Sequence, residues 1–224
     1  MVERGKYIVI EGSDGTGKSR QAIQVSSQLQ TLGYDSLLVY NDETGNMEPV
    51  QEPGGTPEAN LIRARIKDAS IPRTPWENVE WFTEARQLIW RDAINPALEG
   101  GKWVVAARSW ISTVAYQGYG QGINIDAIWN YTYEKVGYEY MTPDLLIILA
   151  LQNEVVRKRR LSERDQNSSL DTFESMPEQF QHEMQGGYVR FASDNNIAII
   201  DADQTPEMVN AAIWKQINQL LGER

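Results

Sequence analysis

The sequence predicts an α/β fold in which a parallel, five-stranded sheet carries helices on both faces. Apolar runs with strand character alternate with helical patterns along the chain, and strands separated by helices usually pair in parallel. The runs are continuous rather than alternating, as expected of strands that are covered on both faces. No repeat or linker divides the chain, so we expect a single domain over residues 1–224.

Each strand can be placed from its apolar run. The five predicted strands are Tyr7–Ile10, Ser36–Tyr40, Trp103–Ala106, Leu145–Leu151 and Ile197–Ile200. Because parallel sheets bind ligands beyond the carboxyl ends of their strands, the loops at that edge are the candidate site. One of them is the predicted long loop Asn41–Thr56, which is rich in glycine, proline and acidic residues.

The helices are predicted from apolar spacing and from their end signals. The first follows Lys18, repeats apolar residues every three or four positions and ends at Gly33. Pro57 occupies the first turn of the next helix. Further helices are predicted over Glu77–Arg91 and from about Pro206 to the C-terminus.

Composition excludes several classes of protein. Of the 224 residues, 41% are hydrophobic and 23% are charged, as in ordinary globular proteins. The net charge of −10 argues against a nucleic-acid partner, which needs a basic face. No stretch approaches the ~20 apolar residues that cross a bilayer. The chain has no cysteine, so disulfides and thiolate metal sites are excluded, and we expect a cytoplasmic location and no membrane partner.

The strongest motif lies between the first strand and the first helix. The pattern G-x-x-x-x-G-K-[ST] is fulfilled by Gly12, Ser13, Asp14, Gly15, Thr16, Gly17, Lys18 and Ser19. Its backbone N–H groups and the helix N-terminus would bind the phosphates of ATP. Lys18 would reach the β- and γ-phosphates, and the Ser19 hydroxyl would be a ligand of Mg²⁺.

Two other classes of phosphate-loop protein fit poorly. A GTPase should carry an Asn-Lys-x-Asp motif, which is absent from the sequence. An ATPase motor should end a buried strand with a magnesium-binding acid, and neither Val104–Ala107 nor Leu145–Leu151 does. A small-molecule kinase is therefore favoured.

Further segments make the chain resemble the thymidylate kinases over nearly its whole length. Besides the phosphate loop, these are Glu52-Pro53-Gly54-Gly55-Thr56, Ala115-Tyr116-Gln117-Gly118, Pro143-Asp144-Leu145, Arg164-Asp165-Gln166-Asn167 and Asp201-Ala202. The first two of these patterns are the specific ones. The resemblance implies a P-loop NTPase fold with a small basic lid, and the transfer of a phosphoryl group from ATP to dTMP.

The resemblance also implies which residues bind the base. Phe82 occupies the position of the aromatic ring that stacks on thymine. Arg86, one helical turn later, would donate to a base carbonyl from the same face. Gln117 and Thr113 match positions at the base edge, and the Gln117 amide can both donate and accept.

The phosphate and sugar contacts follow from the same resemblance. Arg63 and Arg108 match arginines that clamp the acceptor phosphate, for which a planar guanidinium is well suited. Asp14 stands near the position of the sugar 3′-hydroxyl. We therefore expect Lys18, Arg108, Asp14 and a lid arginine to be the catalytic residues.

The basic run 157–160 with Arg164 lies where these kinases carry a mobile lid, at approximately 157–175. The phosphate loop supplies no arginine, because Gly15 follows Asp14. The lid would then provide the cation that stabilises the transferring phosphoryl group. Arg164 is the first candidate, and Arg159, which we expect at the ATP site, is the second.

The sequence departs from the family pattern at several positions. Ala107 replaces an aspartate, Ser109 an aromatic residue, and Gln51 and Thr172 two arginines. Asn41–Val50 looks like an acidic insertion beside the acceptor pocket. In an active kinase, Asp14 or Glu52 would take over part of the lost aspartate's magnesium-binding role.

Two alternatives to dTMP kinase activity stay open. The acceptor could be another pyrimidine deoxynucleotide, such as dUMP or a base modified at C5, or the chain could be a nucleotide-binding relative that has lost turnover. The retained lysine and arginines favour activity. The resemblance also implies a homodimer.

Overall fold

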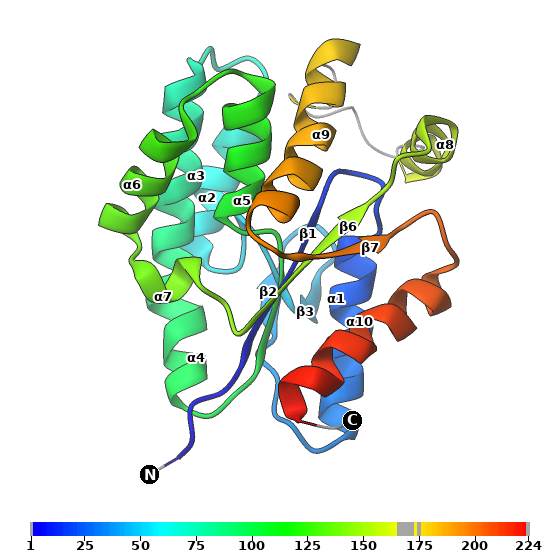
Figure 1. Ribbon diagram of the computed structural model, residues 1–224. Helices are drawn as coiled ribbons and strands as arrows, with labels where there is room; N and C mark the ends of the chain where they lie inside the picture. Colours follow the sequence, from blue (N-terminus) through cyan, green and yellow to red (C-terminus); the bar gives the residue numbers. More distant parts are fainter. Residues whose placement is uncertain (1, 165–172, 174–175, 223–224) are drawn as a thin grey trace.

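The computed structural model describes residues 2–164, 173 and 176–222. Its main sheet has the strand order β4-β5-β1-β6-β7, and every neighbouring pair is parallel (Figure 1). The strands are β1 (Tyr7–Gly12), β4 (Val50–Gln51), β5 (Val104–Ala107), β6 (Leu145–Ala150) and β7 (Ala198–Asp201). The predicted parallel, five-stranded sheet with helices on both faces is confirmed.

Alternate residues of the strands enter two hydrophobic cores. In β1, Ile8 and Ile10 pack with α1 (Lys18–Thr31) and α10 (Pro206–Leu221). Tyr7 and Val9 face the larger core on the other side of the sheet. Burial on both faces explains why the strands read as continuous apolar runs.

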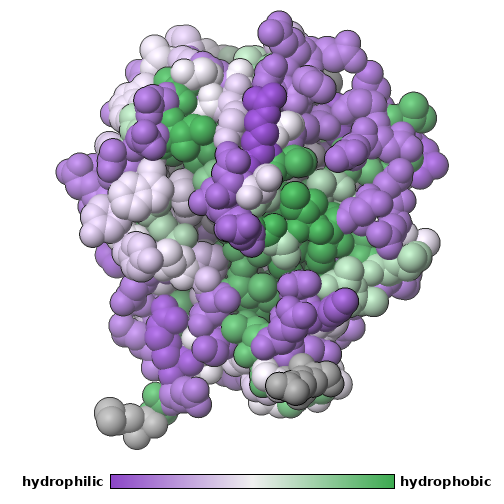
Figure 2. Space-filling view, viewed as in Figure 1, coloured by the Kyte–Doolittle hydropathy of each residue, from purple (hydrophilic) through white to green (hydrophobic). Residues whose placement is uncertain are grey.

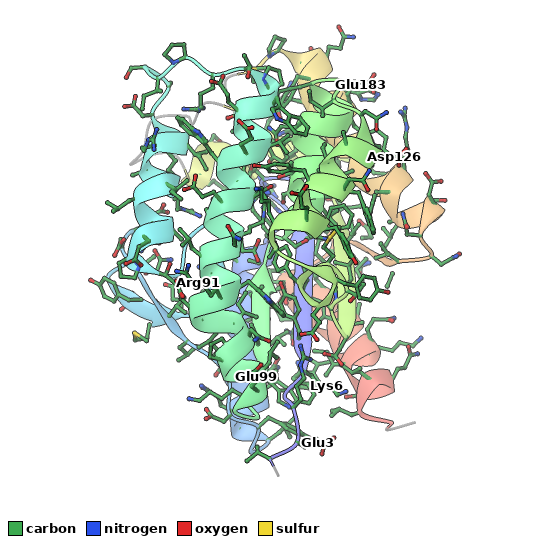
Figure 3. All side chains as sticks on the ribbon, turned by 90° about the vertical axis from the view of Figure 1, so that its left-hand side faces the viewer. Glu3, Lys6, Arg91, Glu99, Asp126 and Glu183 are labelled. Carbon is green, nitrogen blue, oxygen red and sulfur yellow. The ribbon has the colours of Figure 1, made fainter. Side chains whose placement is uncertain are left out.

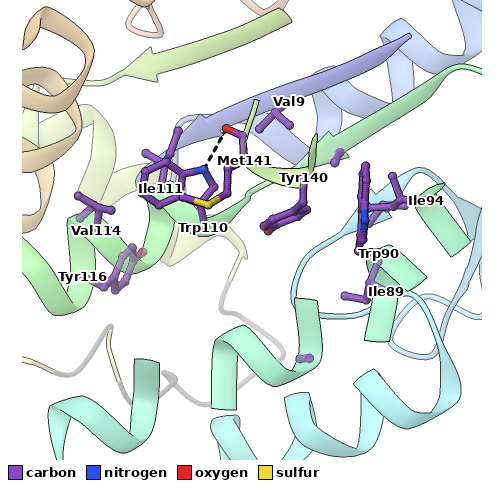
Figure 4. Packing of buried hydrophobic residues seen from close by; sticks show 14 of the residues in the cluster. Val9, Ile89, Trp90, Ile94, Trp110, Ile111, Val114, Tyr116, Tyr140 and Met141 are labelled. Carbon is purple, nitrogen blue, oxygen red and sulfur yellow. Dashed lines mark hydrogen bonds between the residues drawn. The ribbon is translucent and has the colours of Figure 1, made fainter. Parts of the chain in front are cut away.

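The larger core is covered by the helices on the left of Figure 1 and by α9. These are α2 (Pro57–Lys67), α3 (Pro75–Ile89), π-helix η1 (Trp90–Ile94), α4 (Asn95–Glu99), α5 (Trp110–Thr113), π-helix η2 (Val114–Gly120), α6 (Ile125–Lys135), α7 (Tyr138–Met141) and α9 (Glu178–Asp194). Figure 4 shows large aromatic side chains filling this layer, with Trp110 Nε1 donating to the Met141 carbonyl at 3.3 Å. Helix α8 (Glu154–Arg164) follows β6 at the right of Figure 1, and its Val156 packs against the core that holds Ile8 and Ile10.

Helix starts agree with the sequence signals, with small shifts in position. Pro57 occupies the first turn of α2, as predicted, and Thr56 caps the helix ahead of it. Helix α3 begins two residues earlier than expected, because Thr74 and Glu77 form a reciprocal capping box around Pro75. At its other end the helix continues into η1 without a break.

The second strand of the main sheet differs from the prediction. The predicted strand Ser36–Tyr40 touches the sheet only at its start, where Ser36 forms an isolated parallel bridge with Trp103. The chain then leaves the sheet, forms an antiparallel hairpin of β2 (Val39–Asn41) and β3 (Asn46–Glu48), and returns as β4 beside the end of β5. The hairpin therefore interrupts the strand that begins at Ser36 and resumes at Val50. Val50 is fully buried in the sheet, a position that the acidic residues of the hairpin could not occupy. The predicted loop Asn41–Thr56 contains β3 and β4.

The surface carries charged side chains on the outer side of the helical layer and a hydrophobic area elsewhere. Figure 3 shows Arg91, Glu99 and Asp126 pointing outward from the helical layer, and all three are exposed. In Figure 2, hydrophobic side chains gather in the middle of the visible face, near β7 and α10, where Ile199 is exposed. Within the described part of the chain, no helix is both long and apolar enough to span a membrane.

Candidate active site

A cleft with a volume of about 920 Å³ opens at the carboxyl ends of β1, β4 and β5. Residues from the phosphate loop, the β2–β3 hairpin, α2, α3, α5 and η2 line it. The cleft brings together the predicted site residues Asp14, Lys18, Ser19, Arg63, Phe82, Arg86, Arg108, Thr113 and Gln117. Residues far apart in the sequence thus meet at the sheet edge at which ligand binding is expected.

The phosphate loop joins β1 directly to α1, as its motif predicts. Gly12, Gly15 and Gly17 all have positive φ angles, of 144°, 87° and 85°. Such angles suit glycine and let the backbone turn its N–H groups inward. Lys18 is buried behind this turn, and its Nζ donates to the Ser13 carbonyl and to Asp14 Oδ1, each at 3.2 Å.

Lys18 has an altered ionisation. Burial, followed by the positive charge of Arg108, lowers the pKa of its ammonium to about 8, although Asp14 opposes the shift. The charge of Lys18 therefore depends on its anionic neighbour. A phosphate placed in the loop would favour the charged form in the same way.

Asp14 connects the phosphate loop with the other side of the cleft. Its Oδ1 accepts a hydrogen bond from Arg108 Nη2 at 2.5 Å, and its Oδ2 accepts one from the Tyr116 hydroxyl at 2.7 Å. Arg108 has a φ of 76°, a left-handed conformation that is uncommon for any residue but glycine. Backbone strain of this kind is often retained at functional sites.

A second group of residues forms the opposite end of the cleft. The aromatic rings of Phe82 and Phe173 lie 5.9 Å apart between centroids, and the Arg86 guanidinium lies 5.3 Å from the Phe82 centroid. Arg86 Nη1 donates a hydrogen bond to the Thr113 hydroxyl at 2.7 Å, so Thr113 helps to position the Arg86 guanidinium. Gln117 is fully buried, and its Oε1 has no hydrogen-bond partner among the described residues.

Glu52 does not fit the magnesium role considered for it. Its side chain is fully buried, and its Oε2 accepts from Arg86 Nε at 2.9 Å and from the Tyr140 hydroxyl at 2.6 Å. Burial raises the pKa of the Glu52 carboxyl to about 7, against the opposing effects of Arg86 and Tyr140. The carboxylate instead orients Arg86, which leaves Asp14 as the better placed acid.

Glu11 is a buried acid for which the sequence alone predicted no role. Its Oε1 accepts from the Ser109 backbone N–H at 2.6 Å, the Ser109 hydroxyl at 2.9 Å and the Ser112 backbone N–H at 3.1 Å. Its Oε2 accepts from the Ser112 hydroxyl at 2.9 Å. Glu11 thereby fixes the turn that carries Arg108, and the Ser109 hydroxyl is one of its partners. The signal in the sequence was that Glu11, an acidic residue, directly follows the apolar run Tyr7–Ile10.

The basic run presents different arginines to the phosphate loop than predicted. Arg160 Nη1 donates to the Gly15 carbonyl at 3.3 Å and to the Ala202 carbonyl at 2.9 Å. Arg157 is buried beside the loop, where its Cγ would lie 3.3 Å from a Cβ added at Gly15, but its Nη2 donates to Glu154 Oε2 at 3.1 Å. Arg159 is 64% exposed and lies 3.7 Å from Glu163, so it makes no such contact. Arg157 and Arg160 are three residues apart and so share one face of a helix, a spacing that could have identified both from the sequence.

Part of the lid prediction falls outside the described residues. Arg164 is the last residue of α8, but its side chain is not described, and neither are residues 165–172 and 174–175. Among the described residues, no three or more histidine, cysteine or acidic side chains form a metal-binding group. A metal at this cleft would need oxygen ligands from the nucleotide as well.

Comparison with known proteins identifies a family. Residues 10–213 match the family model described as thymidylate kinase. The curated thymidylate kinase of Gluconobacter oxydans is 32% identical over 226 residues, covering 99% of this chain and 98% of the relative. That of Chlorobaculum parvum is 30% identical over 220 residues, covering 95% of each.

A solved structure agrees in fold. The thymidylate kinase of Ehrlichia chaffeensis superposes with a TM-score of 0.72 and 21% sequence identity, covering 96% of this chain and 99% of that one. The likeness covers nearly the whole chain, in agreement with the P-loop NTPase fold that the phosphate loop predicts.

Proposed function

The chain belongs to the thymidylate kinase family and phosphorylates dTMP to dTDP with ATP, and we propose that Mg²⁺ and the residues of the cleft carry out this transfer. The observation that carries the proposal is the position of Asp14. It bonds Lys18 of the phosphate loop and Arg108 at the far side of the same cleft. Donor and acceptor sites are thereby joined at one carboxylate.

The ATP phosphates bind the loop Gly12–Ser19. Backbone N–H groups and the N-terminus of α1 contact the phosphate oxygens, and Lys18 neutralises the β- and γ-phosphates. Arg160 adds positive charge where α8 packs on Gly15, and it already joins the loop to Ala202, whereas the Arg157 guanidinium is paired with Glu154. Arg159 as an ATP contact and Arg164 as the catalytic lid cation remain predictions.

The base of dTMP lies on Phe82, at the end of the cleft that holds Arg86 and Gln117. Gln117 Nε2 donates to Gln121 Oε1 at 3.2 Å, so its Oε1 is the atom directed to the ligand. That oxygen accepts the N3–H of thymine, and Arg86 donates to a ring carbonyl. Cytosine has an acceptor at N3 and is therefore disfavoured.

The acceptor phosphate lies between Arg63 and Arg108, which both line the cleft. Asp14 contacts the sugar 3′-hydroxyl and holds Arg108 in place. An acceptor phosphate oxygen attacks the γ-phosphorus of ATP, the bond to the β-phosphate oxygen breaks, and ADP leaves. The attacking oxygen already carries negative charge at neutral pH, so positioning and charge neutralisation account for most of the catalysis.

Oxygen ligands near the phosphate loop suit Mg²⁺, which prefers a few carboxylate or hydroxyl contacts beside substrate phosphates and water. Ser19 lines the cleft beside the phosphate loop and is the residue that would hold the ion; Asp14 lines it too, but its carboxylate already accepts from Lys18, Arg108 and Tyr116. When bound, Mg²⁺ neutralises charge on the β- and γ-phosphates. Ala107 contributes no ligand, so the chain uses fewer protein oxygens than the family pattern.

The homodimer that the family resemblance implies, and the cytoplasmic location expected from the lack of cysteine, belong to the same proposal. Light scattering of the purified chain tests the first of these: a mass near twice the 25.4 kDa of one chain is expected. A single-chain mass at micromolar concentration would contradict it.

The catalytic proposal is tested by measuring ADP release from Mg-ATP with dTMP, dUMP, dCMP, a C5-modified dUMP and dGMP as separate acceptors. Turnover should be fastest with dTMP and absent in Lys18→Ala. Preference for dUMP or the modified base would identify the alternative acceptor. Binding of ATP and dTMP without any turnover would identify an inactive relative.

A further inference from the structure

The β2–β3 hairpin (residues 39–48) is stabilised from within by Glu48. Its Oε2 accepts hydrogen bonds from Asn41 Nδ2 at 2.8 Å and from Gln51 Nε2 at 2.6 Å. Its Oε1 accepts from the Thr44 hydroxyl at 2.7 Å. The hairpin can therefore keep its shape when its contacts with the rest of the protein change.

Two other carboxylates connect the hairpin to helix α2. Asp42 Oδ2 accepts from the neutral amide of Asn60 at 2.5 Å. Glu43 Oε1 accepts from Arg63 Nε at 3.1 Å and also from Lys67 Nζ. Arg63 and Lys67 lie one helical turn apart on the same face of α2, so a single carboxylate oxygen is held between two cations.

This contact lies at the edge of the active-site cleft. Glu43, Arg63 and Lys67 line both the cleft and a second hollow of about 190 Å³ between the hairpin and α2. The Glu43 side chain is 50% exposed, so it can rotate into solvent without disturbing a core. Burial would raise the pKa of Glu43, but Arg63 and Lys67 hold it below its usual value, so the carboxylate is charged at neutral pH.

We propose that Glu43 occupies the acceptor-phosphate clamp from within the molecule, and that Lys67 is a second cation of that clamp beside Arg63. The proposal rests on the proposed function, in which Arg63 binds the acceptor phosphate. A carboxylate oxygen shared by a guanidinium and an ammonium occupies the position that a phosphate oxygen needs. An arriving nucleotide phosphate displaces the carboxylate and contacts both cations.

The consequence is selective competition. Glu43 weakens binding of every acceptor that carries a phosphate, and it does not affect a nucleoside that lacks one. Exposed ion pairs contribute little energy, so release of the carboxylate should change affinity by roughly two- to fivefold. The acidic hairpin thereby sets the acceptor concentration at which the enzyme is half saturated.

Isothermal titration of dTMP and of thymidine tests the proposal. Glu43→Gln should bind dTMP roughly two- to fivefold more tightly than the matched control Asp42→Asn and should leave thymidine affinity unchanged. The control removes the same charge from the same hairpin, but among the described residues its carboxylate bonds the Asn60 amide of α2 and no cation. Equal dTMP affinities in the two variants, or an equal gain for thymidine, would overturn the proposal.

Two further variants separate this proposal from the one on which it rests. In the Glu43→Gln background, Lys67→Gln should weaken dTMP binding and leave thymidine binding unchanged; no loss of dTMP affinity would remove Lys67 from the clamp. Arg63→Gln should abolish most of the preference for dTMP over thymidine. If Arg63→Gln removes the preference for dTMP, but Glu43→Gln binds dTMP no more tightly than Asp42→Asn does, only the proposed competition by Glu43 fails. If Arg63→Gln keeps the preference, the phosphate clamp itself is wrong, and both proposals fail.

Discussion

Arg86 and Glu52 form an ion pair that is buried completely, with Arg86 Nε 2.9 Å from Glu52 Oε2. Tyr140 donates to the same carboxylate oxygen, and Arg86 also bonds Thr113. The guanidinium is thereby held over the ring of Phe82. In the proposed function, recognition of the base would therefore depend on a buried pair that water does not reach.

The pair makes stability depend on pH in a defined direction. Burial raises the pKa of Glu52 from 4.5 to about 7. Between these values the folded protein retains a proton that the unfolded chain releases, so the free energy of unfolding falls as pH rises. Urea unfolding between pH 5 and pH 8 should show a loss of about 2–3 kcal/mol relative to Glu52→Gln, which has no titrating group at position 52. Parallel pH profiles for the two proteins would contradict the prediction.

Gln117 should control the choice of base. Its Oε1 is buried without a protein partner among the described residues, so a ligand N–H is its natural donor. Gln117→Leu should raise KM for dTMP by roughly 5- to 150-fold, because about 1–3 kcal/mol is lost with such a bond. It should also reduce the preference for dTMP over dCMP. Gln121→Ala is the control, since it removes only the contact at Nε2. An unchanged preference in Gln117→Leu would exclude this role.

The sequence predicted the parts of the structure that local rules determine. The phosphate loop needs glycines at positive φ beside a strand and a helix, and Gly12, Gly15 and Gly17 provide them. Buried strands need continuous apolar runs, which β1, β5 and β6 have. The family patterns then placed residues from five segments in one cleft, and the structure brings them together there.

Long-range contacts were the parts that sequence reasoning could not supply. The burial of Glu52 against Arg86 depends on packing between β4 and α3, which no local spacing reveals. The interrupted strand was missed because Ser36–Tyr40 has a good strand composition, while the two residues of β4 are too few to form a pattern. Arg160 was passed over because its partner carbonyls at Ala202 and Gln204 belong to a distant turn.

The ionisation of Lys18 should limit activity at high pH. Burial lowers its pKa to about 8, so the enzyme without bound ATP loses this charge as pH rises through that value. We expect kcat/KM for ATP to fall above pH 8, by up to about tenfold per pH unit, at saturating dTMP. Lys18→Arg keeps its charge throughout, so this variant should be slower but should lack the decline. The same decline in both proteins would assign it to another group.

Asp14 and Arg108 should act as one unit in catalysis. Arg108 Nη2 lies 2.5 Å from Asp14 Oδ1, and Arg108 has a left-handed backbone conformation. Asp14→Asn and Arg108→Met should each lower kcat/KM for dTMP, since each breaks the same contact. The double variant should then lose less than the product of the two effects, by roughly 5- to 150-fold, which corresponds to a coupling of about 1–3 kcal/mol.

A second cycle provides the comparison for this coupling. Arg63 also lines the cleft but bonds the Gln51 carbonyl and Glu43, so Asp14→Asn and Arg63→Met should combine to within about 0.5 kcal/mol of additivity. Steady-state kinetics with varied dTMP at saturating ATP measure both cycles. If the Arg108 cycle is as additive as the Arg63 cycle, Asp14 does not position Arg108, and the two residues act on the substrate independently.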